Sequence, residues 1–212
     1  MLAWFNRRAR RGDWMQTFSG VRYWPADPRV ADVRIVDIAH ALSNLCRYTG
    51  HVRIYYSVAE HSIHVSHVVP PEHALTGLLH DATEAYTNDI NKPLKRSLPD
   101  YQRIESRNWK VIAEKFGLPI EMPAEVHRAD HALLRTEQVA LMPYCDLTPH
   151  WREHAVPGLK IHCWTPAEAE ARFMQRFYEL TCGLGSRAQP SDYASSDGFQ
   201  AMRAWLAGAK PV

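Results

Sequence analysis

The chain has 212 residues, of which 46% are hydrophobic and 23% charged, and its formal net charge at pH 7 is +2. These are ordinary values for a globular protein with a sizeable core, and they exclude an overall positive field that would hold nucleic acid. No apolar run reaches the roughly 18 residues of a membrane span, and the basic N-terminus lacks the apolar stretch of a signal peptide. The four cysteines form no CxxC pair, so we expect reduced thiols, a cytoplasmic protein and no membrane partner.

Composition divides the chain into three parts. Residues 1–14 carry four arginines and are predicted to be a basic arm, residues 15–186 are the main domain, and residues 187–212 are a polar tail. Phe199, Met202, Trp205 and Leu206 give the tail a short amphipathic helix. This stripe packs on its own domain or on a second copy in a homodimer.

The predicted elements begin with an irregular segment. Glycine and prolines between residues 17 and 36 favour a small β-hairpin or an irregular segment there. Asp37 is then predicted to cap a helix that Gly50 ends. Ser57 is predicted to cap the next helix, with Glu60 three residues later completing a capping-box pattern.

The rest of the chain is predicted to be mainly helical. A third helix is expected over about residues 72–86, followed by a loop over 87–93. Pro99 opens a long helix that Gly117 closes. Further helices are expected over about 123–141 and over 166–180, the second capped by Thr165, with an irregular stretch over 143–161 between them.

Two histidines and two aspartates stand out against this background. His80 and Asp81 follow the apolar run 77–79, where a charged group needs a partner. His61 lies on the preceding helix and Asp130 on a later one, and a helical bundle brings such residues to one ion in its core. Two imidazoles and two carboxylates suit one divalent cation, Mn²⁺, Co²⁺, Fe²⁺, Ni²⁺, Mg²⁺ or Zn²⁺, and we therefore predict metal-assisted hydrolysis.

Glu84 is predicted to lie near this metal and need not bind it. It follows His80 by four residues, so in a helix it lies one turn on along the same face, where a carboxylate can take a proton from water. His64 and His67 are expected to be half-exposed rather than to form a second metal face.

Five short motifs also match a known family in order and spacing. They are residues 45–51 (LCRYTGH), 56–62 (YSVAEHS), 80–86 (HDATEAY), 89–95 (DINKPLK) and 128–130 (RAD). On these motifs the chain resembles the HD-domain metal-dependent phosphohydrolases, and among them the 5′-deoxynucleotidase-like proteins of bacteria and phages. The resemblance covers about residues 15–182 and implies an all-α HD-domain helical bundle with the small β-hairpin near the N-terminus.

The resemblance also implies roles for individual residues. His61, His80, Asp81 and Asp130 would bind the metal. Two-metal members of this superfamily carry extra histidines between the His-Asp pair and the last aspartate, and here only His127 lies there, so one metal ion is expected. Glu84 would position or deprotonate the attacking water, with Asp89 assisting. Arg47 would hold the substrate phosphate, which suits a forked cation, and Tyr48 would lie beside the sugar.

The expected partner is a small-molecule nucleotide, with no stable nucleic acid complex. The leading prediction is removal of phosphate from (deoxy)nucleoside 5′-monophosphates. One alternative is a dATPase-like dNTP triphosphohydrolase that releases triphosphate, and another is a non-catalytic HD-like module that binds nucleotide or nucleic acid. The cations after Asp89 bear on the choice between the two substrates, because a triphosphate needs more positive charge than a monophosphate. A run of charged residues is usually a solvated face. Lys95 is nevertheless predicted to bind the substrate.

Overall fold

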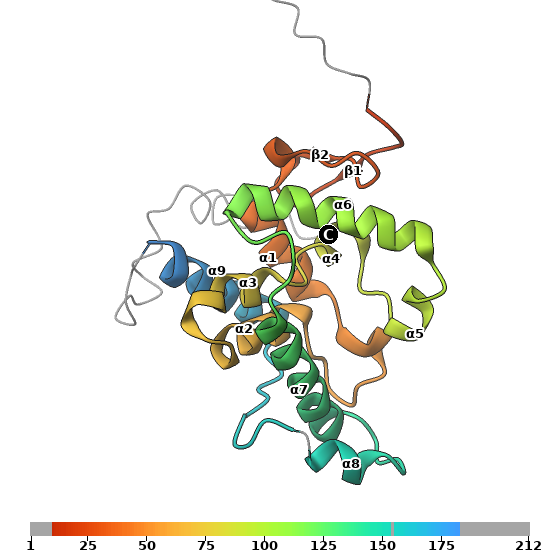
Figure 1. The fold of residues 1–212 in the computed structure, drawn as a ribbon, viewed down its shortest axis with the longest axis vertical. Helices are drawn as coiled ribbons and strands as arrows, with labels where there is room; N and C mark the ends of the chain where they lie inside the picture. The colour runs from red at the N-terminus through yellow and green to blue at the C-terminus, as the bar shows by residue number, and fades with distance from the viewer. Residues whose placement is uncertain (1–9, 154, 183–212) are drawn as a thin grey trace, which may run out of the picture.

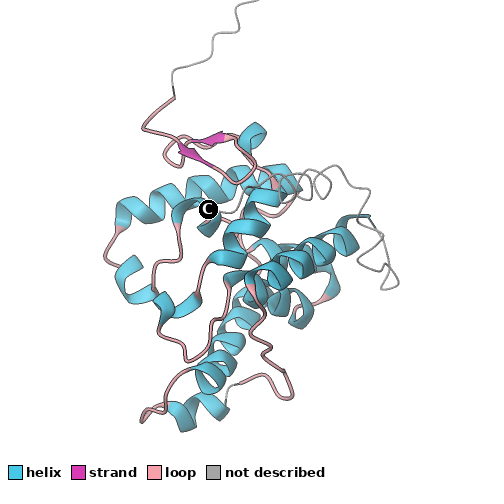
Figure 2. Cartoon of the chain, turned by 180° about the vertical axis from the view of Figure 1, so that it is seen from behind, coloured by secondary structure: helices cyan, strands magenta, loops and turns pink. Residues whose placement is uncertain are grey.

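The computed structural model describes residues 10–153 and 155–182, and helices make up most of this part of the chain (Figure 1). A two-stranded antiparallel hairpin precedes them (Figure 2). The predicted mainly helical fold with a small β-hairpin near the N-terminus is therefore confirmed.

The hairpin lies across the long helix α6 (Pro99–Phe116) (Figure 1). Its strands are β1 (Met15–Gln16) and β2 (Arg22–Tyr23), with Met15 opposite Tyr23. Gly20, at φ +80°, supplies the left-handed residue in the turn. The Tyr23 hydroxyl donates to Asn108 Oδ1 at 2.7 Å, so a buried hydrogen bond fastens the hairpin to α6.

Helix α1 (Ile35–Asn44) begins two residues before Asp37 and ends six residues before Gly50. The predicted capping role of Asp37 is therefore wrong: its carboxylate accepts hydrogen bonds from the backbone N–H and the hydroxyl of Ser19 and fastens the hairpin turn to α1. The predicted end at Gly50 is also wrong, because Cys46 leaves the helix to form an antiparallel bridge with Ser57.

Helix α2 (Val58–Val68) begins where predicted, and Ser57 Oγ accepts from the N–H of Glu60 at 3.1 Å. The Glu60 side chain does not return to this cap. Its two carboxylate oxygens accept the backbone N–H groups of His162, Cys163 and Trp164. Glu60 therefore fixes the segment that leads into α9 (Pro166–Cys182) against α2.

The helix predicted over residues 72–86 is broken. A 3-10 turn (Pro71–His73) leads into α3 (Ala74–Leu79), and α4 (Glu84–Thr87) follows after a gap. Within the gap the backbone hydrogen bonds tighten to three-residue spacing, from Ala82 N–H to Leu79 and from Glu84 N–H to Asp81. The break therefore falls at His80–Thr83, the segment that carries two predicted metal ligands.

Two long helices flank this segment. Helix α6 begins at Pro99 and ends at Gly117, which is left-handed with φ +66°, as predicted. The short helix α5 (Lys92–Lys95) lies in the segment predicted to be a loop. Helix α7 (Ala124–Leu141) confirms the helix predicted over 123–141, whereas α8 (Thr148–Glu153) lies in a stretch predicted to be irregular.

The main core surrounds α2, which contacts α1, α3, α7 and α9. Its fully buried members include Ile38, Leu42, Val58, Leu78, Leu79 and Phe173. Thr165 and Glu168 form a reciprocal capping box at the start of α9, as predicted. The core therefore holds α2 with His61, α7 with Asp130 and the end of α3, where His80 follows, in fixed relation to one another.

The predicted arm and tail lie largely outside the described residues, which do not include 1–9 or 183–212. The Phe199–Leu206 stripe, and with it the predicted homodimer contact, lies in the second of these ranges. Arg10, at the end of the arm, is described. It forms an ion pair with Asp32 and donates to the carbonyl of Asp27, and its guanidinium lies over Trp24.

Candidate metal centre

Two imidazole nitrogens point into one space between α2, α3 and α7. Nε2 of His61 and Nε2 of His80 lie 3.3 Å apart. Nδ1 of His61 lies 2.6 Å from Glu137 Oε1, and Nδ1 of His80 lies 2.8 Å from the carbonyl oxygen of Gly77. Because each Nδ1 faces an acceptor, the neutral ring carries its proton there and leaves Nε2 as an available ligand.

Both predicted aspartates reach the same space. Asp130 Oδ1 lies 3.2 Å from Nε2 of His61. Asp81 Oδ2 lies 3.2 Å from Nε2 of His80 and 3.7 Å from Nε2 of His61. The ligand atoms of His61, His80 and Asp130 all lie within 4.8 Å of one another, so this His-His-Asp group can hold a metal ion, with Asp81 beside it.

The electrostatics of this group are those of a cation site. Burial and Arg47 act to lower the pKa of His61, but Glu137 and Asp130 outweigh them and raise it to about 9. Burial raises the pKa of Asp130, yet His61 and His80 hold it well below its usual range, and His80 does the same for Asp81. Positive charge is therefore favoured at this point, and a divalent cation can supply it in place of a proton.

Glu137 is a residue of this candidate site that was not predicted from the sequence. Its side chain is fully buried on α7 and makes four hydrogen bonds. Oε1 faces His61 Nδ1 and the Tyr56 hydroxyl at 2.9 Å, and Oε2 accepts from Arg47 Nε at 3.1 Å and from the Tyr48 hydroxyl at 2.8 Å. Burial raises the pKa of Glu137, but Arg47 and His61 outweigh it and lower the pKa to about 2.

A sequence signal for Glu137 existed. It follows Asp130 by seven residues, about two helical turns, which puts both side chains on the same face of α7. Its immediate sequence neighbours, Thr136 and Gln138, are polar. The criterion that singled out His80–Asp81, a charged group after an apolar run, therefore does not identify Glu137, and only its helical spacing from Asp130 does.

Arg47 lies next to Asp81, as the phosphate-binding prediction requires. Its side chain is buried, and Nη1 lies 3.5 Å from Asp81 Oδ2. The turn over Arg47–Gly50 places it there because Tyr48 and Thr49 adopt left-handed backbone conformations. Burial opposes the charge of Arg47, but Glu137 and Asp81 outweigh it and raise its pKa, so the guanidinium stays charged.

Tyr48 does not present its hydroxyl to the metal group. The hydroxyl donates to Glu137 and lies 3.2 Å from the carbonyl oxygen of Leu134. The Arg47 guanidinium lies 5.5 Å from the centre of the Tyr48 ring. Any contact of Tyr48 with a substrate is therefore made through the ring.

Glu84 and Asp89 add negative charge beside Asp81. Glu84 is buried, and its Oε2 atom has no hydrogen-bond partner among the described residues. Burial and the neighbouring Asp81 and Asp89 raise the pKa of Glu84 well above its usual range, and burial also raises the pKa of Asp89. Two carboxyl groups with raised pKa values beside a cation site are suited to proton transfer.

Lys95 on α5 lies close enough to this acidic group to interact with Glu84 and Asp89. Its ammonium lies 2.7 Å from Glu105 Oε1 and 5.6 Å from the centre of the Tyr101 ring. Glu105 is therefore its direct partner, and Glu84 adds a longer-range attraction that helps to raise the pKa of Lys95.

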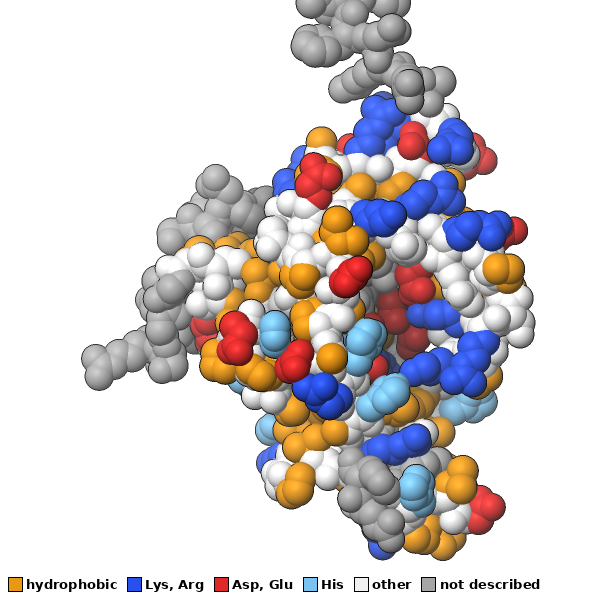
Figure 3. Space-filling view, in the orientation of Figure 1, with side chains coloured by type: hydrophobic (Ala, Val, Ile, Leu, Met, Phe, Trp, Pro, Cys, Tyr) orange, Lys and Arg blue, Asp and Glu red, His pale blue; other side chains and the backbone are white. Residues whose placement is uncertain are grey.

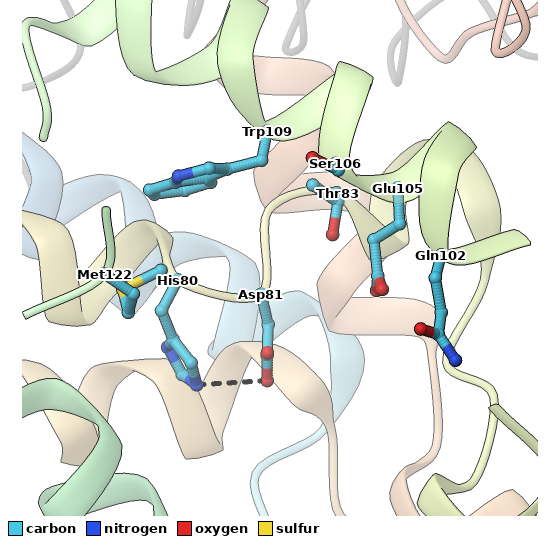
Figure 4. Close-up of a pocket in the computed structure, with 8 residues that line it drawn as sticks. All are labelled: His80, Asp81, Thr83, Gln102, Glu105, Ser106, Trp109 and Met122. Atoms are coloured by element: carbon cyan, nitrogen blue, oxygen red, sulfur yellow. Dashed lines mark ion pairs between the residues drawn. The ribbon is translucent and has the colours of Figure 1, made fainter. Parts of the chain in front are cut away.

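A cleft of about 270 Å³ opens from His80 and Asp81 toward α6 (Figure 4). Its far wall carries one aromatic ring and several polar groups, contributed by Gln102, Glu105, Ser106 and Trp109. Figure 3 shows acidic side chains recessed in a hollow with Lys and Arg side chains around it. An anionic ligand that reaches the metal group would pass these cations first.

The two histidines expected to be half-exposed differ in the structure. His67 is exposed, but His64 is buried, and the expectation is wrong for it. Nε2 of His64 lies 3.5 Å from Glu60 Oε1, and its ring stacks with those of His162 and Trp164. His64 therefore belongs to the packing between α2 and the segment before α9, away from the metal group.

The geometry can be compared with known proteins. No family model matches the chain. It is 41% identical over 174 residues to the uncharacterized protein YfdR of Escherichia coli (strain K12), across 79% of this chain and 95% of that protein. It is 31% identical over 190 residues to the uncharacterized protein RCAP_rcc00048 of Rhodobacter capsulatus, across 81% of this chain and 97% of that protein.

The chain belongs to the family of YfdR and RCAP_rcc00048. The names of these relatives state no activity, so function must be argued from the site. Among the described residues, no helix is long and apolar enough to cross a membrane.

Proposed function

We propose that the protein is an HD-type metal-dependent phosphohydrolase that acts on nucleotides and removes phosphate from (deoxy)nucleoside 5′-monophosphates. The observation that carries this proposal is the convergence of His61 Nε2, His80 Nε2 and Asp130 Oδ1, with Asp81 beside them. These residues suit one divalent cation, Mn²⁺, Co²⁺, Fe²⁺, Ni²⁺, Mg²⁺ or Zn²⁺. When bound, such a cation polarises the phosphoryl group and makes water a better nucleophile.

The phosphate is held by Arg47 in this proposal. Its Nε atom is bound to Glu137, so its Nη groups are the ones available beside Asp81. A guanidinium in this position neutralises charge on the phosphoryl oxygens and orients the group toward the cation site. The hydrogen bond to Glu137 keeps the planar fork in place before substrate arrives.

The proton of the attacking water goes to Glu84. Its unpartnered Oε2 atom is the acceptor, and its raised pKa makes it a stronger base than an exposed carboxylate. A cation beside Asp81 would add positive charge and lower this pKa again, which favours the ionised carboxylate that can accept the proton. Asp89, whose pKa is also raised, supports the same role.

The nucleoside is proposed to occupy the cleft between the metal group and α6. The Trp109 ring offers an apolar face, and Gln102 and Ser106 offer hydrogen-bonding groups. The ring of Tyr48 would approach the sugar, and Lys95 would lie near the substrate's negative charge. The free thiols of Cys46, Cys145, Cys163 and Cys182 suit the reducing cytoplasm, which we keep as the proposed location.

A dNTP triphosphohydrolase is the second candidate function. The observation that favours it is the group of cations on α5, beyond those that a single phosphate needs. Both reactions use the same metal group and differ in the bond that is hydrolysed.

A nucleotide panel tests the proposal. The full chain, loaded in turn with each divalent metal, is incubated with nucleoside mono- and triphosphates, and the products are identified. Free phosphate from monophosphates supports the leading proposal, and tripolyphosphate from dNTPs supports the second. Lack of any product with every metal, from protein shown to bind the metal, contradicts both.

A further inference from the structure

A second pocket of about 480 Å³ lies beside the metal centre, lined by residues of α5, α7 and α8. Its polar side chains are those of Lys92 and Arg96 after the metal segment, His131 and Arg135 on α7, and His150 on α8. His131 and Arg135 are four residues apart and share one face of α7. No carboxylate lines this pocket.

The cations of this pocket are not neutralised by the described part of the protein. Lys92 Nζ lies 3.1 Å from His131 Nε2, and Arg135 Nη1 donates to Gln138 Oε1 at 2.9 Å. Neither partner is an anion, and Lys92, Arg96 and Arg135 form no ion pair with any residue in 10–153 or 155–182.

Nearby cations behave differently. Lys95 pairs with Glu105, Arg103 with Asp100 and Arg128 with Glu125. Three cations without a carboxylate partner among the described residues, Lys92, Arg96 and Arg135, thus line one pocket. Like charges held close together raise the local positive potential, and an anion in the pocket would relieve it.

Helix α7 connects the pocket with the metal centre. His131 follows Asp130 on α7, and Leu134, which lines the pocket, offers its carbonyl oxygen to the Tyr48 hydroxyl. An extended anion can therefore lie in the pocket with one end near the metal group. A guanidinium binds phosphoryl oxygens through paired N–H donors, and two such groups with an ammonium suit several phosphoryl groups in a row.

We propose that this pocket binds a chain of phosphoryl groups, a di- or triphosphate. The chain has two possible sources. It is the distal part of a nucleotide whose first phosphate lies at the metal group, which rests on the proposed function, or it is a separate polyphosphate-bearing ligand. Binding in the pocket needs no hydrolysis, so it can be tested even if the proposed function fails.

Calorimetric titration with inorganic tripolyphosphate tests the binding. The full chain is used in buffer without added divalent metal, so that an anion held by a cation at the metal group does not contribute. The Arg96→Gln/Arg135→Gln double variant is expected to bind tripolyphosphate more weakly, by about tenfold or more for each lost guanidinium. This is the effect of losing one charge-assisted hydrogen bond. The single variant Lys92→Gln changes an exposed side chain and serves if the double variant does not fold.

The matched control is Lys110→Gln/Lys115→Gln, which removes the same charge from exposed positions of α6. It is expected to bind tripolyphosphate like the unmodified protein. Equal affinities in the pocket variants and the unmodified protein, or an equal loss in the control, would overturn the proposal because the attraction would then be general.

Two further measurements separate the sources. If the bound phosphoryl groups belong to the nucleotide substrate, Arg96→Gln/Arg135→Gln raises KM for nucleoside triphosphates and leaves KM for monophosphates unchanged. If the bound phosphoryl groups belong to a separate ligand, the metal-loaded protein binds tripolyphosphate with the same affinity whether or not it is saturated with a nucleoside monophosphate. Either result supports the pocket. Tripolyphosphate binding that is unchanged in all pocket variants contradicts it whether or not the protein hydrolyses nucleotides.

Discussion

Glu137 Oε1 lies 2.6 Å from Nδ1 of His61, and Glu137 is carried by the same helix as Asp130. One face of α7 therefore supplies a ligand oxygen and also orients the imidazole from α2. A carboxylate in this position holds the ring in one tautomer and makes Nε2 a stronger ligand. The same carboxylate holds Arg47, so the metal group and the proposed phosphate ligand share one buried support.

Glu137→Gln is expected to weaken metal binding by roughly 10–100-fold, the usual effect of removing a partner that orients a metal ligand. The amide keeps the size of the side chain but loses the charge that stabilises His61 and Arg47. Metal affinity is measured by titration of the metal-free protein. Tyr56→Phe is the control, since it removes one hydrogen bond to Glu137 and leaves the contact with His61. Unchanged affinity in Glu137→Gln would show that His61 needs no such support.

Metal affinity is expected to rise with pH. The pKa of His61 is raised to about 9, so below that pH the metal must displace a proton from Nε2. Release of one proton makes the apparent affinity rise by about tenfold per pH unit in this range and level off above pH 9. Metal titrations at several pH values in a buffer that does not bind metals measure the slope. A flat profile between pH 7 and about 9 would contradict a raised His61 pKa.

The fold was predictable where local chemistry decides it. Ser57, Pro99 and Gly117 mark helix ends in sequence, and each lies at the predicted end in the structure. Asp37 was not predictable in the same way, because its carboxylate is used by Ser19, a residue 18 positions away. Capping rules describe local competition and cannot represent a distant donor that binds the same oxygen.

The site was predictable in composition but not in arrangement. His61, His80, Asp81 and Asp130 were selected by residue type and motif, and the structure brings them together. The break of the helix at His80 was not foreseen because the pattern of apolar residues continues across it. Only tertiary structure shows how charged groups of three helices share one space.

Glu84→Ala is expected to bind metal normally and to lose turnover by about 10²–10⁴, the usual contribution of a general base. The control is Glu114→Ala, which removes an exposed carboxylate of α6 and should leave kcat unchanged. Turnover is measured on protein with confirmed metal content. A nearly normal kcat in metal-loaded Glu84→Ala would show that Glu84 is not the base, and Asp89 would be the next candidate.

Glu84→Gln has a second expected effect, on stability. The folded-state pKa of Glu84 is raised, so the folded protein disfavours its ionised form, and stability falls as pH rises above the ordinary glutamate value. The neutral amide removes this cost. Metal-free Glu84→Gln is therefore expected to melt at the same temperature as the unmodified protein in acid and at a higher one at neutral pH. A lower melting temperature at neutral pH would indicate that Glu84 has a stabilising partner.

Arg47→Lys separates charge from geometry at the proposed phosphate ligand. Lysine keeps the positive charge near Glu137 and Asp81 but loses the planar fork, so we expect kcat/KM to fall by roughly 1–3 kcal/mol of transition-state binding. Arg47→Ala should lose more and also destabilise the fold, because it leaves the buried Glu137 without its cation. Arg103→Lys, on an exposed arginine of α6, is the control. If both Arg47 variants keep normal kcat/KM on every nucleotide that the protein cleaves, the phosphate is held elsewhere, and Lys95 and the unpaired cations Lys92, Arg96 and Arg135 become the next candidates.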